Sequence, residues 1–163
     1  MKMNDLALFG GDPVRKTPFF TWPRVVDGQQ EKLINTLVND SWGIGSESIR
    51  ELEDKFALFH EAKSCIAVNT GTNALWVALK AAGVSSGDEV IIPAYTFIAT
   101  ATAVLMANAT PVFVDIEPNT FNMDPNLIES AITDRTKVII PVHIGGNPAD
   151  MESIIDLAMK HKL

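Results

Sequence analysis

Only one cysteine occurs in the chain, Cys65, and no stretch of the sequence is dense in positive charge. A single cysteine excludes a disulfide framework within the chain, which fits a reducing compartment, and Cys65 is expected to be a small buried residue rather than a nucleophile. The net charge of −7, with no basic block to offset it, argues against a nucleic-acid partner.

Long hydrophobic runs are missing as well. The longest apolar stretch, residues 97–107, is interrupted by threonines and is shorter than the roughly 20 residues that span a bilayer. The first residues do not form a signal-peptide pattern. We therefore expect a cytoplasmic protein with no membrane partner.

Several cofactor motifs are absent. The glycine pairs 10–11 and 145–146 do not form the G-x-G-x-x-G pattern of dinucleotide-binding enzymes, which disfavours a nicotinamide or flavin oxidoreductase. There is no P-loop, and His, Cys and carboxylate residues do not cluster at metal-ligand spacing. Nearly half of the 163 residues are apolar, so a globular fold with a real core is expected.

The chain changes pattern near residue 63, which predicts an N-terminal arm with helices over 1–62 and a second domain over 63–163. In the first part, residues 1–27 are irregular, and Ser46 or Ser48 can cap the second of two helices. The predicted helices are 29–38, 47–60, 72–82, 97–107, 125–132 and 148–161, the last two opening on Asp-Pro and Asn-Pro. The predicted strands are 64–69, 89–93, 110–116 and 137–143.

Short apolar strands alternating with helices predict an α/β fold of three layers, α/β/α, with a mostly parallel sheet covered on both faces. Leu163 follows the last helix at the point where the next strand of such a sheet is expected. We therefore expect residues 63–163 to be the first part of a larger, truncated domain, whose uncovered apolar faces and strand edges favour aggregation.

Residues 64–75 suggest a phosphate site. An apolar run ends at Thr70-Gly71-Thr72, and a helix-forming run begins at once. Such a turn directs the first free N–H groups of a helix at whatever lies above the strand end, and the helix dipole favours negative charge there. Helix capping without any ligand explains the same pattern about equally well.

Other candidate residues follow the other strands, and ligands of open α/β sheets lie at these carboxyl ends. Tyr95 and Phe97 follow the second strand, Asp115 ends the third, and His143 ends the fourth. Together with the turn they would suit a flat, phosphorylated aromatic ligand. Each also has a simpler interpretation: Phe97 as a core residue, Asp115 as a turn residue, and His143 as a hydrogen-bonded structural histidine.

Six segments, in order and at matching spacing, resemble the DegT/StrS family of pyridoxal-phosphate (PLP) sugar aminotransferases, which have the aspartate-aminotransferase fold. These segments are Glu51–Ala57, Asn69–Leu75, Asp88–Pro93, Tyr95–Thr100, Pro111–Asp115 and Pro141–His143. The arm, with Leu6–Arg15 and Trp22-Pro23, resembles a subgroup that acts on keto-inositols or makes aminohydroxybenzoate.

The resemblance implies roles for four residues. Thr70, Gly71 and Thr72 match the turn that holds the PLP phosphate, and Phe97 matches the aromatic residue that stacks on the pyridine ring. Tyr95, Asp115 and His143 receive no firm role. The family's Schiff-base lysine, and the aspartate that pairs with the pyridine nitrogen, match no residue of this chain, so it is expected to be inactive alone.

For the complete enzyme the resemblance implies transfer of an amino group from glutamate or glutamine to a keto-sugar or keto-cyclitol, by a homodimer. Two alternatives remain open at this stage. One is a PLP-dependent sugar dehydratase of the same fold, which differs at the lysine position. The other is a non-catalytic α/β module that binds a phosphorylated ligand.

Overall fold

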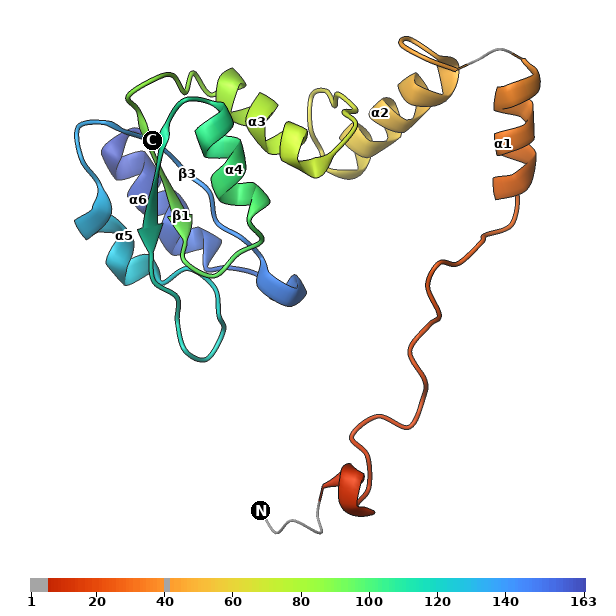
Figure 1. Cartoon of the computed structure of the whole chain (residues 1–163), viewed down its shortest axis with the longest axis horizontal. Coiled ribbons are helices and arrows are strands. Elements are labelled where there is room, and N and C mark those ends of the chain that lie inside the picture. Colours follow the sequence, from red (N-terminus) through yellow and green to blue (C-terminus); the bar gives the residue numbers. More distant parts are fainter. Residues whose placement is uncertain (1–5, 40–41) are drawn as a thin grey trace. The chain divides into compact units, whose positions relative to one another are not determined.

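The structure, a computed structural model, describes residues 6–39 and 42–163. The chain divides into two compact units, Met1–Cys65 and Ile66–Leu163. Figure 1 shows the helices of the first unit and the helices and strands of the second. Each unit forms its own set of contacts.

The described part of the first unit contains a short 3-10 helix, η2 (Ala7–Phe9), and two α-helices, α1 (Gln29–Val38) and α2 (Glu47–Phe59). Both predicted helices are confirmed. Ser46 caps α2, since its hydroxyl accepts a hydrogen bond from the N–H of Ile49 at 3.3 Å. A capped start of this kind relies on local chemistry alone, which explains why the sequence pattern located the helix.

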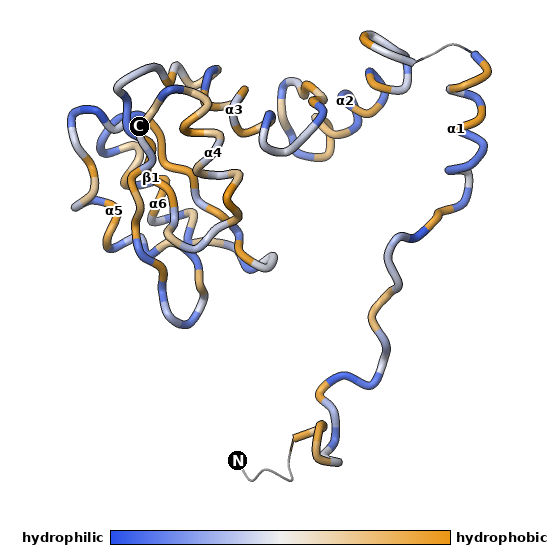
Figure 2. The backbone as a smooth tube through the Cα atoms, in the orientation of Figure 1, coloured by the Kyte–Doolittle hydropathy of each residue, from blue (hydrophilic) through white to orange (hydrophobic). Residues whose placement is uncertain are grey.

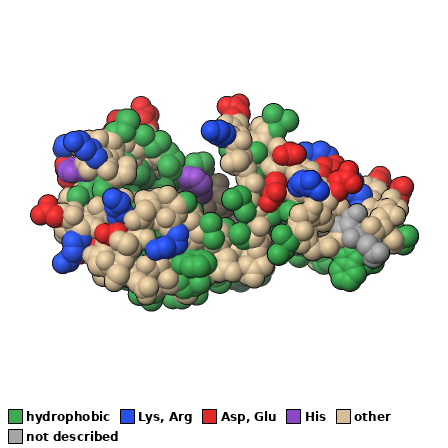
Figure 3. Space-filling view, turned by 90° about the horizontal axis from the view of Figure 1, so that it is seen from above, with side chains coloured by type: hydrophobic (Ala, Val, Ile, Leu, Met, Phe, Trp, Pro, Cys, Tyr) green, Lys and Arg blue, Asp and Glu red, His purple; other side chains and the backbone are tan. Residues whose placement is uncertain are grey.

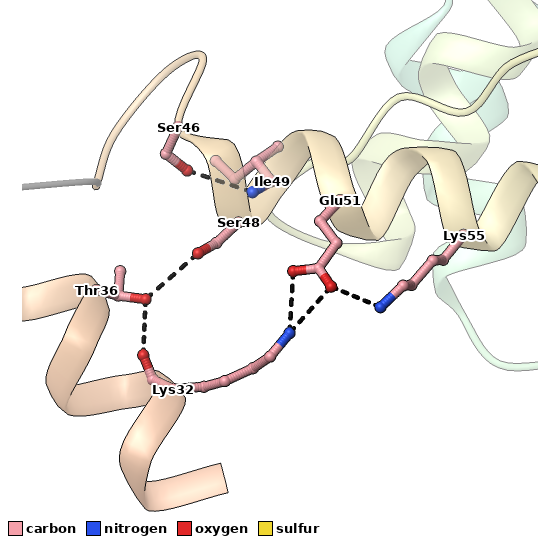
Figure 4. A network of polar contacts seen from close by, with 7 residues as sticks. All are labelled: Lys32, Thr36, Ser46, Ser48, Ile49, Glu51 and Lys55. Atoms are coloured by element: carbon pink, nitrogen blue, oxygen red, sulfur yellow. Dashed lines mark hydrogen bonds and ion pairs between the residues drawn. The ribbon is translucent and has the colours of Figure 1, made fainter. Parts of the chain in front are cut away.

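A carboxylate on α2 joins the two helices of the first unit (Figure 4). Lys32 of α1 lies 2.9 Å from the carboxylate of Glu51, and Lys55 lies 2.5 Å from it along α2. Hydrogen bonds from Lys55 and Lys32 lower the pKa of Glu51 from its ordinary 4.5 to about 2. Because the group is exposed, solvent screens these pairs and their contribution to stability is small.

The first unit buries little apolar surface. Of its described residues in helices, only Ala57 is buried. The apolar residues of α1 are exposed, as are the aromatic residues of the arm (Leu33, Ile34, Leu37, Val38, Phe19, Phe20 and Trp22). Hydrophobic side chains accordingly lie among charged ones on the surface in Figure 3. An apolar face of this kind is a surface on which another chain can pack.

The second unit is an α/β fold. Its strands are β1 (Glu89–Pro93), β2 (Thr110–Val114) and β3 (Thr136–Ile139), and its helices are α3 (Gly71–Ala81), α4 (Ala99–Met106), α5 (Pro125–Ala131), η3 (Ile144–Gly146) and α6 (Met151–His161). The strand order is β2-β1-β3. Both pairings are parallel, which confirms the predicted sheet.

Helices cover both faces of this sheet, as the three-layer prediction requires (Figure 1). All five residues of β1 are buried, and alternate side chains of the strand enter different clusters. Val90 and Ile92 pack with residues of α3 and α4, whereas Ile91 packs with residues of α5 and α6. Figure 2 colours most of β1 as hydrophobic, as expected for a strand that is buried on both faces.

A buried carboxylate fixes the amino end of β1. Glu89 accepts hydrogen bonds from the hydroxyl of Thr133 at 2.5 Å and from Nε of Arg135 at 3.0 Å, and it pairs with Nη2 of Arg135. The bonds from Thr133 and Arg135 hold the pKa of Glu89 below its ordinary value. The network ties β1 to the segment that leads into β3.

The predicted strand over 64–69 is wrong, because this segment forms no strand in the structure. Its apolar character favours an extended backbone, but a strand also needs a hydrogen-bonded partner, and none of β1, β2 and β3 pairs with this segment. Two other strands are shorter than predicted, since β2 ends at Val114 and β3 at Ile139. An isolated antiparallel bridge between Ile116 and Met123 follows β2.

Two helix starts also differ from prediction. The last helix, α6, begins at Met151, capped by the Asp150 carboxylate at 3.2 Å from the N–H of Ser153, and not at Pro148. Helix α4 begins at Ala99, two residues after Phe97. None of the helices formed by residues 6–39 and 42–163 has the length and apolar character needed to traverse a bilayer.

Candidate functional site

A pocket of about 520 Å³ opens in the second unit, where the chain leaves β1 and β3 and enters α3. Its volume lies within the roughly 300–1,000 Å³ that small-molecule sites occupy. The lining residues are Gly71, Thr72, Leu75, Thr96, Phe97, Ala99, Thr100, Val142, His143, Ile144 and Gly145. The predicted Gly71, Thr72 and Phe97 therefore lie together, with His143 beside them.

The first wall of the pocket is the start of α3. Thr70 is its N-cap, and the Thr70 hydroxyl accepts the N–H of Asn73 at 3.1 Å, so Thr70 caps the helix. Among the described residues, nothing accepts a hydrogen bond from the N–H of Gly71 or of Thr72. These two donors stand at the positive end of the helix dipole, where an anion binds favourably.

Gly71 leaves this wall open. A Cβ atom built on Gly71 would have no heavy atom within 4 Å. A ligand can therefore approach the backbone of α3 closely, which an anion bound by N–H groups must do.

Phe97 forms the second wall. Its side chain is 75% exposed, so the alternative that Phe97 is a core residue is wrong. The loop that carries it is fixed at both ends: Ala94 donates its N–H to Val114 at 2.8 Å, and the hydroxyls of Thr96 and Thr100 lie 2.8 Å apart. An exposed ring on a fixed loop suits stacking on a flat ligand.

The third wall carries His143. The Nδ1 atom of its ring accepts the backbone N–H of Ala149 at 2.9 Å, as expected for a hydrogen-bonded histidine. The short helix η3 follows, with Gly145 and Gly146 at φ angles of 59° and 84°. Both residues lie in the left-handed region that glycine adopts without strain, so this turn depends on glycine.

Asn122 supports the third wall and was missed by the sequence analysis. It is 2% exposed and makes three hydrogen bonds to distant backbone. Its Nδ2 donates to the carbonyls of Asn147 and Pro148, and its Oδ1 accepts the N–H of Ile144. The pattern of the sequence gives no sign of these partners, because they lie 22 to 26 residues away.

Two other candidates lie outside the pocket lining. Asp115 is exposed, and its carboxylate accepts the N–H of Ile116 at 2.8 Å, which confirms its interpretation as a turn residue. Tyr95 packs its ring against Phe121, with ring centres 6.0 Å apart. Neither side chain is among those that line the pocket.

The described residues of the pocket wall include no lysine and no arginine. A bound phosphate would therefore rely on the N–H groups and dipole of α3 and on the Thr72 hydroxyl. Together with the exposed Phe97 ring, these donors match a flat, phosphorylated aromatic molecule better than a dinucleotide.

The chain is similar in sequence to proteins of a known family. The profile of the DegT/DnrJ/EryC1/StrS aminotransferase family matches residues 25–163. The chain belongs to this family. The match spans both units and includes every residue of the pocket.

Relatives in the family resemble the chain along most of its length. L-glutamine:2-deoxy-scyllo-inosose aminotransferase of Streptomyces kanamyceticus is 39% identical, over 99% of this chain and 39% of its own. The chain thus spans about two fifths of the length of such relatives.

Solved structures of similar proteins share the fold of this chain. The structure of 3-amino-5-hydroxybenzoic acid synthase superimposes with a TM-score of 0.85 at 38% identity, over 89% of this chain and 38% of the other. Spr1654 of Streptococcus pneumoniae, solved in a PLP form and a PMP form, has a TM-score of 0.79 at 35% identity, over 85% of this chain and 35% of its own.

Proposed function

We propose that the pocket beside α3 binds pyridoxal phosphate and that this chain forms the cofactor-binding part of a sugar or cyclitol aminotransferase. The observation that carries the proposal is the meeting of the free N–H groups of Gly71 and Thr72 with the exposed ring of Phe97 in one pocket. The PLP and PMP forms of Spr1654 support the choice of cofactor.

In this proposal Gly71 and Thr72 bind the phosphate through their N–H groups, and the Thr72 hydroxyl adds a third donor. Thr70 acts through the helix, since its hydroxyl is engaged by Asn73 and holds the first turn of α3 in place. Phe97 stacks on the pyridine ring and shields one of its faces from water. PLP, when bound, supplies the electron sink on which amino-group transfer depends.

The substrates proposed for the complete protein follow its relatives. The name of the Streptomyces kanamyceticus enzyme specifies L-glutamine and a keto-cyclitol. We therefore propose glutamine, or the closely similar glutamate, as amino donor and a keto-cyclitol or keto-sugar as acceptor.

The proposal extends to assembly and location. The exposed apolar residues of α1 and of the arm offer a surface for a second copy, so a homodimer is proposed. One cysteine and a net charge of −7 fit a cytoplasmic enzyme with no nucleic-acid partner.

Equilibrium dialysis of the purified protein tests cofactor binding, with PLP as ligand and pyridoxal, which lacks the phosphate, as control. We expect saturable binding of PLP at least about tenfold tighter than that of pyridoxal, because the α3 donors act only on the phosphate. Equal affinity for the two compounds would overturn the assignment of α3 as the phosphate site.

A further inference from the structure

Residues 116–123, between β2 and α5, form a small hairpin that is not part of the pocket lining. Ile116 and Met123 close it through an antiparallel bridge. Within the loop, the N–H of Glu117 donates to the carbonyl of Asn122 at 2.9 Å. Met123 is fully buried and packs in the core cluster beside α5 and α6. The base of hairpin 116–123 is therefore anchored in the core.

Phe121 of this hairpin contacts the loop that forms the second wall of the pocket. Its backbone is left-handed, with a φ of 60°, which a bulky residue adopts only where its surroundings impose it. Its N–H donates to the carbonyl of Glu117 at 2.9 Å. Its ring lies against that of Tyr95, with centres 6.0 Å apart and planes inclined at 57°. Tyr95 directly precedes Thr96 and Phe97, which both line the pocket.

The next residue, Asn122, contacts the third wall. Its side chain is 2% exposed, and its Oδ1 accepts the N–H of Ile144 at 3.1 Å. Its Nδ2 donates to the carbonyls of Asn147 and Pro148 at 3.2 and 3.0 Å. Ile144 lines the pocket. These bonds resist disruption, because breaking them would leave the buried amide of Asn122 without partners.

We propose that hairpin 116–123 sets the separation of the second and third walls, with Phe121 and Asn122 as its positioning residues. The two residues are consecutive, with Cα atoms about 3.8 Å apart, so movement of one wall is transmitted through the hairpin to the other. The hairpin thereby holds the Phe97 ring at a fixed spacing from η3. Its effect on PLP binding rests on the proposed function.

Two variants of Phe121 test its ring contact, and a third variant is the control. Phe121→Asn removes the ring, and asparagine tolerates the left-handed backbone. Phe121→Tyr is the conservative variant that retains the ring. Phe113→Asn is the matched control, because Phe113 is 58% exposed, close to the 53% of Phe121, but lies on β2 outside the hairpin. All three side chains are replaced at exposed positions, so the variants are expected to fold.

Amide hydrogen exchange of the ligand-free protein, followed by NMR, measures the coupling without any cofactor. The probe is the N–H of Asn147, which donates to the carbonyl of Ile144 at 3.0 Å within η3. Phe121→Asn is expected to accelerate its exchange about 2- to 13-fold, as for the loss of one aromatic pair. Phe121→Tyr and Phe113→Asn are expected to leave the rate near that of the unmodified protein.

Asn122→Ala tests the coupling in the opposite direction. The probe is the N–H of Thr100, which donates to the carbonyl of Phe97 at 3.0 Å in the second wall. Its exchange is expected to accelerate at least about fivefold. The N–H of Ile140, which is hydrogen-bonded to β1, is the reference for global unfolding. An equal acceleration at Ile140 would indicate loss of the whole fold, and the Phe121 variants then decide.

Unchanged exchange at Asn147 in Phe121→Asn would overturn the inference, because each residue would then support only its own wall. A rate in Phe121→Tyr as high as in Phe121→Asn would overturn it too, since the ring would have no part in the effect.

Equilibrium dialysis with PLP then tests the consequence for binding. Phe121→Asn is expected to bind PLP about 2- to 13-fold less tightly than the unmodified protein, and Phe121→Tyr to bind it equally well. If the unmodified protein binds PLP and Phe121→Asn binds it equally tightly, the role of the hairpin in binding is overturned and the proposed cofactor stands. If the unmodified protein does not bind PLP, the proposed function is overturned, and the exchange rates alone decide on the hairpin.

Discussion

A methyl group added at Gly71 is expected to weaken ligand binding without destabilising the fold. The space at its Cβ position is open, and α3 begins there, so alanine fits the protein itself and favours the helix. The same methyl group would stand between a phosphate and the N–H groups of α3.

Gly71→Ala is expected to weaken PLP binding about tenfold or more. The free energy of unfolding should stay unchanged or rise by up to about 1 kcal/mol, because alanine restricts the unfolded chain. Dialysis and urea unfolding measure the two effects, and the weak binding of pyridoxal serves as the control. Unaltered PLP affinity would contradict a phosphate at this position.

At Phe97, too, an effect on ligand binding can be distinguished from an effect on stability, because the ring is exposed. Phe97→Ala is expected to change the free energy of unfolding by less than about 0.5 kcal/mol. It should weaken PLP binding about 2- to 13-fold, the loss of about 0.5–1.5 kcal/mol of ring stacking. Ile98→Ala is the matched control, because Ile98 is 69% exposed but does not line the pocket. Equal effects of the two substitutions would argue against stacking.

At the scale of elements, the amino end of β1 depends on a carboxylate. The bonds from Thr133 and Arg135 lower the pKa of Glu89 in the folded protein, so the unfolded chain takes up a proton at a higher pH than the folded one. The stabilisation is therefore complete above the ordinary value of 4.5 and is lost as the pH falls below it.

Glu89→Gln tests whether the stabilisation by Glu89 is lost, rather than gained, as the pH falls. The variant is expected to be less stable than the unmodified protein near neutral pH, and the difference should shrink as the pH falls from about 5 to about 3. Thermal unfolding across this pH range measures the effect. Glu51→Gln is the exposed control, with a smaller effect expected. A difference that grows on acidification would contradict the assignment.

Helices marked by local signals were predictable, whereas the pairing of apolar segments as strands was predictable only in part, since β1, β2 and β3 formed and the segment 64–69 did not. Helix α2 was located because Ser46 and the apolar spacing after it act within a few residues. The expected strand over 64–69 did not form because a strand needs a partner strand, and an apolar run does not reveal whether one lies beside it.

In the candidate site, too, the sequence predicted local features but not contacts between distant residues. Gly71, Thr72 and Phe97 follow or precede elements whose ends the sequence marks, so their meeting in one pocket could be predicted. The role of Asn122 could not, since its partners lie more than 20 residues along the chain. Long-range contacts of one buried amide leave no periodic signal.

At the scale of the whole molecule, the proposed PLP pocket has no lysine amine among the described residues that line it. With no lysine among the described residues that line it, we expect PLP bound by this 163-residue chain to resist fixation by borohydride, and we expect no transfer of nitrogen from glutamine. Mass spectrometry after reduction and an assay for glutamine consumption test both. A covalent adduct on a lysine, or measurable transamination, would refute this expectation.

The apolar surface of the first unit predicts self-association. Leu33 and Leu37 of α1 are 62% and 57% exposed, so replacing both with glutamine should reduce concentration-dependent association measured by light scattering. Helix α1 has no buried residue among those described, so the double variant should keep the stability of the second unit. Unchanged scattering would remove α1 from the interface.

The order of the three pocket walls along the chain has a consequence for biosynthesis. The start of α3 and the loop of Phe97 are translated before the turn at Gly145. A nascent chain therefore lacks the third wall of the proposed PLP pocket until Gly145 has been synthesised, so binding that uses all three walls must follow the synthesis of this turn.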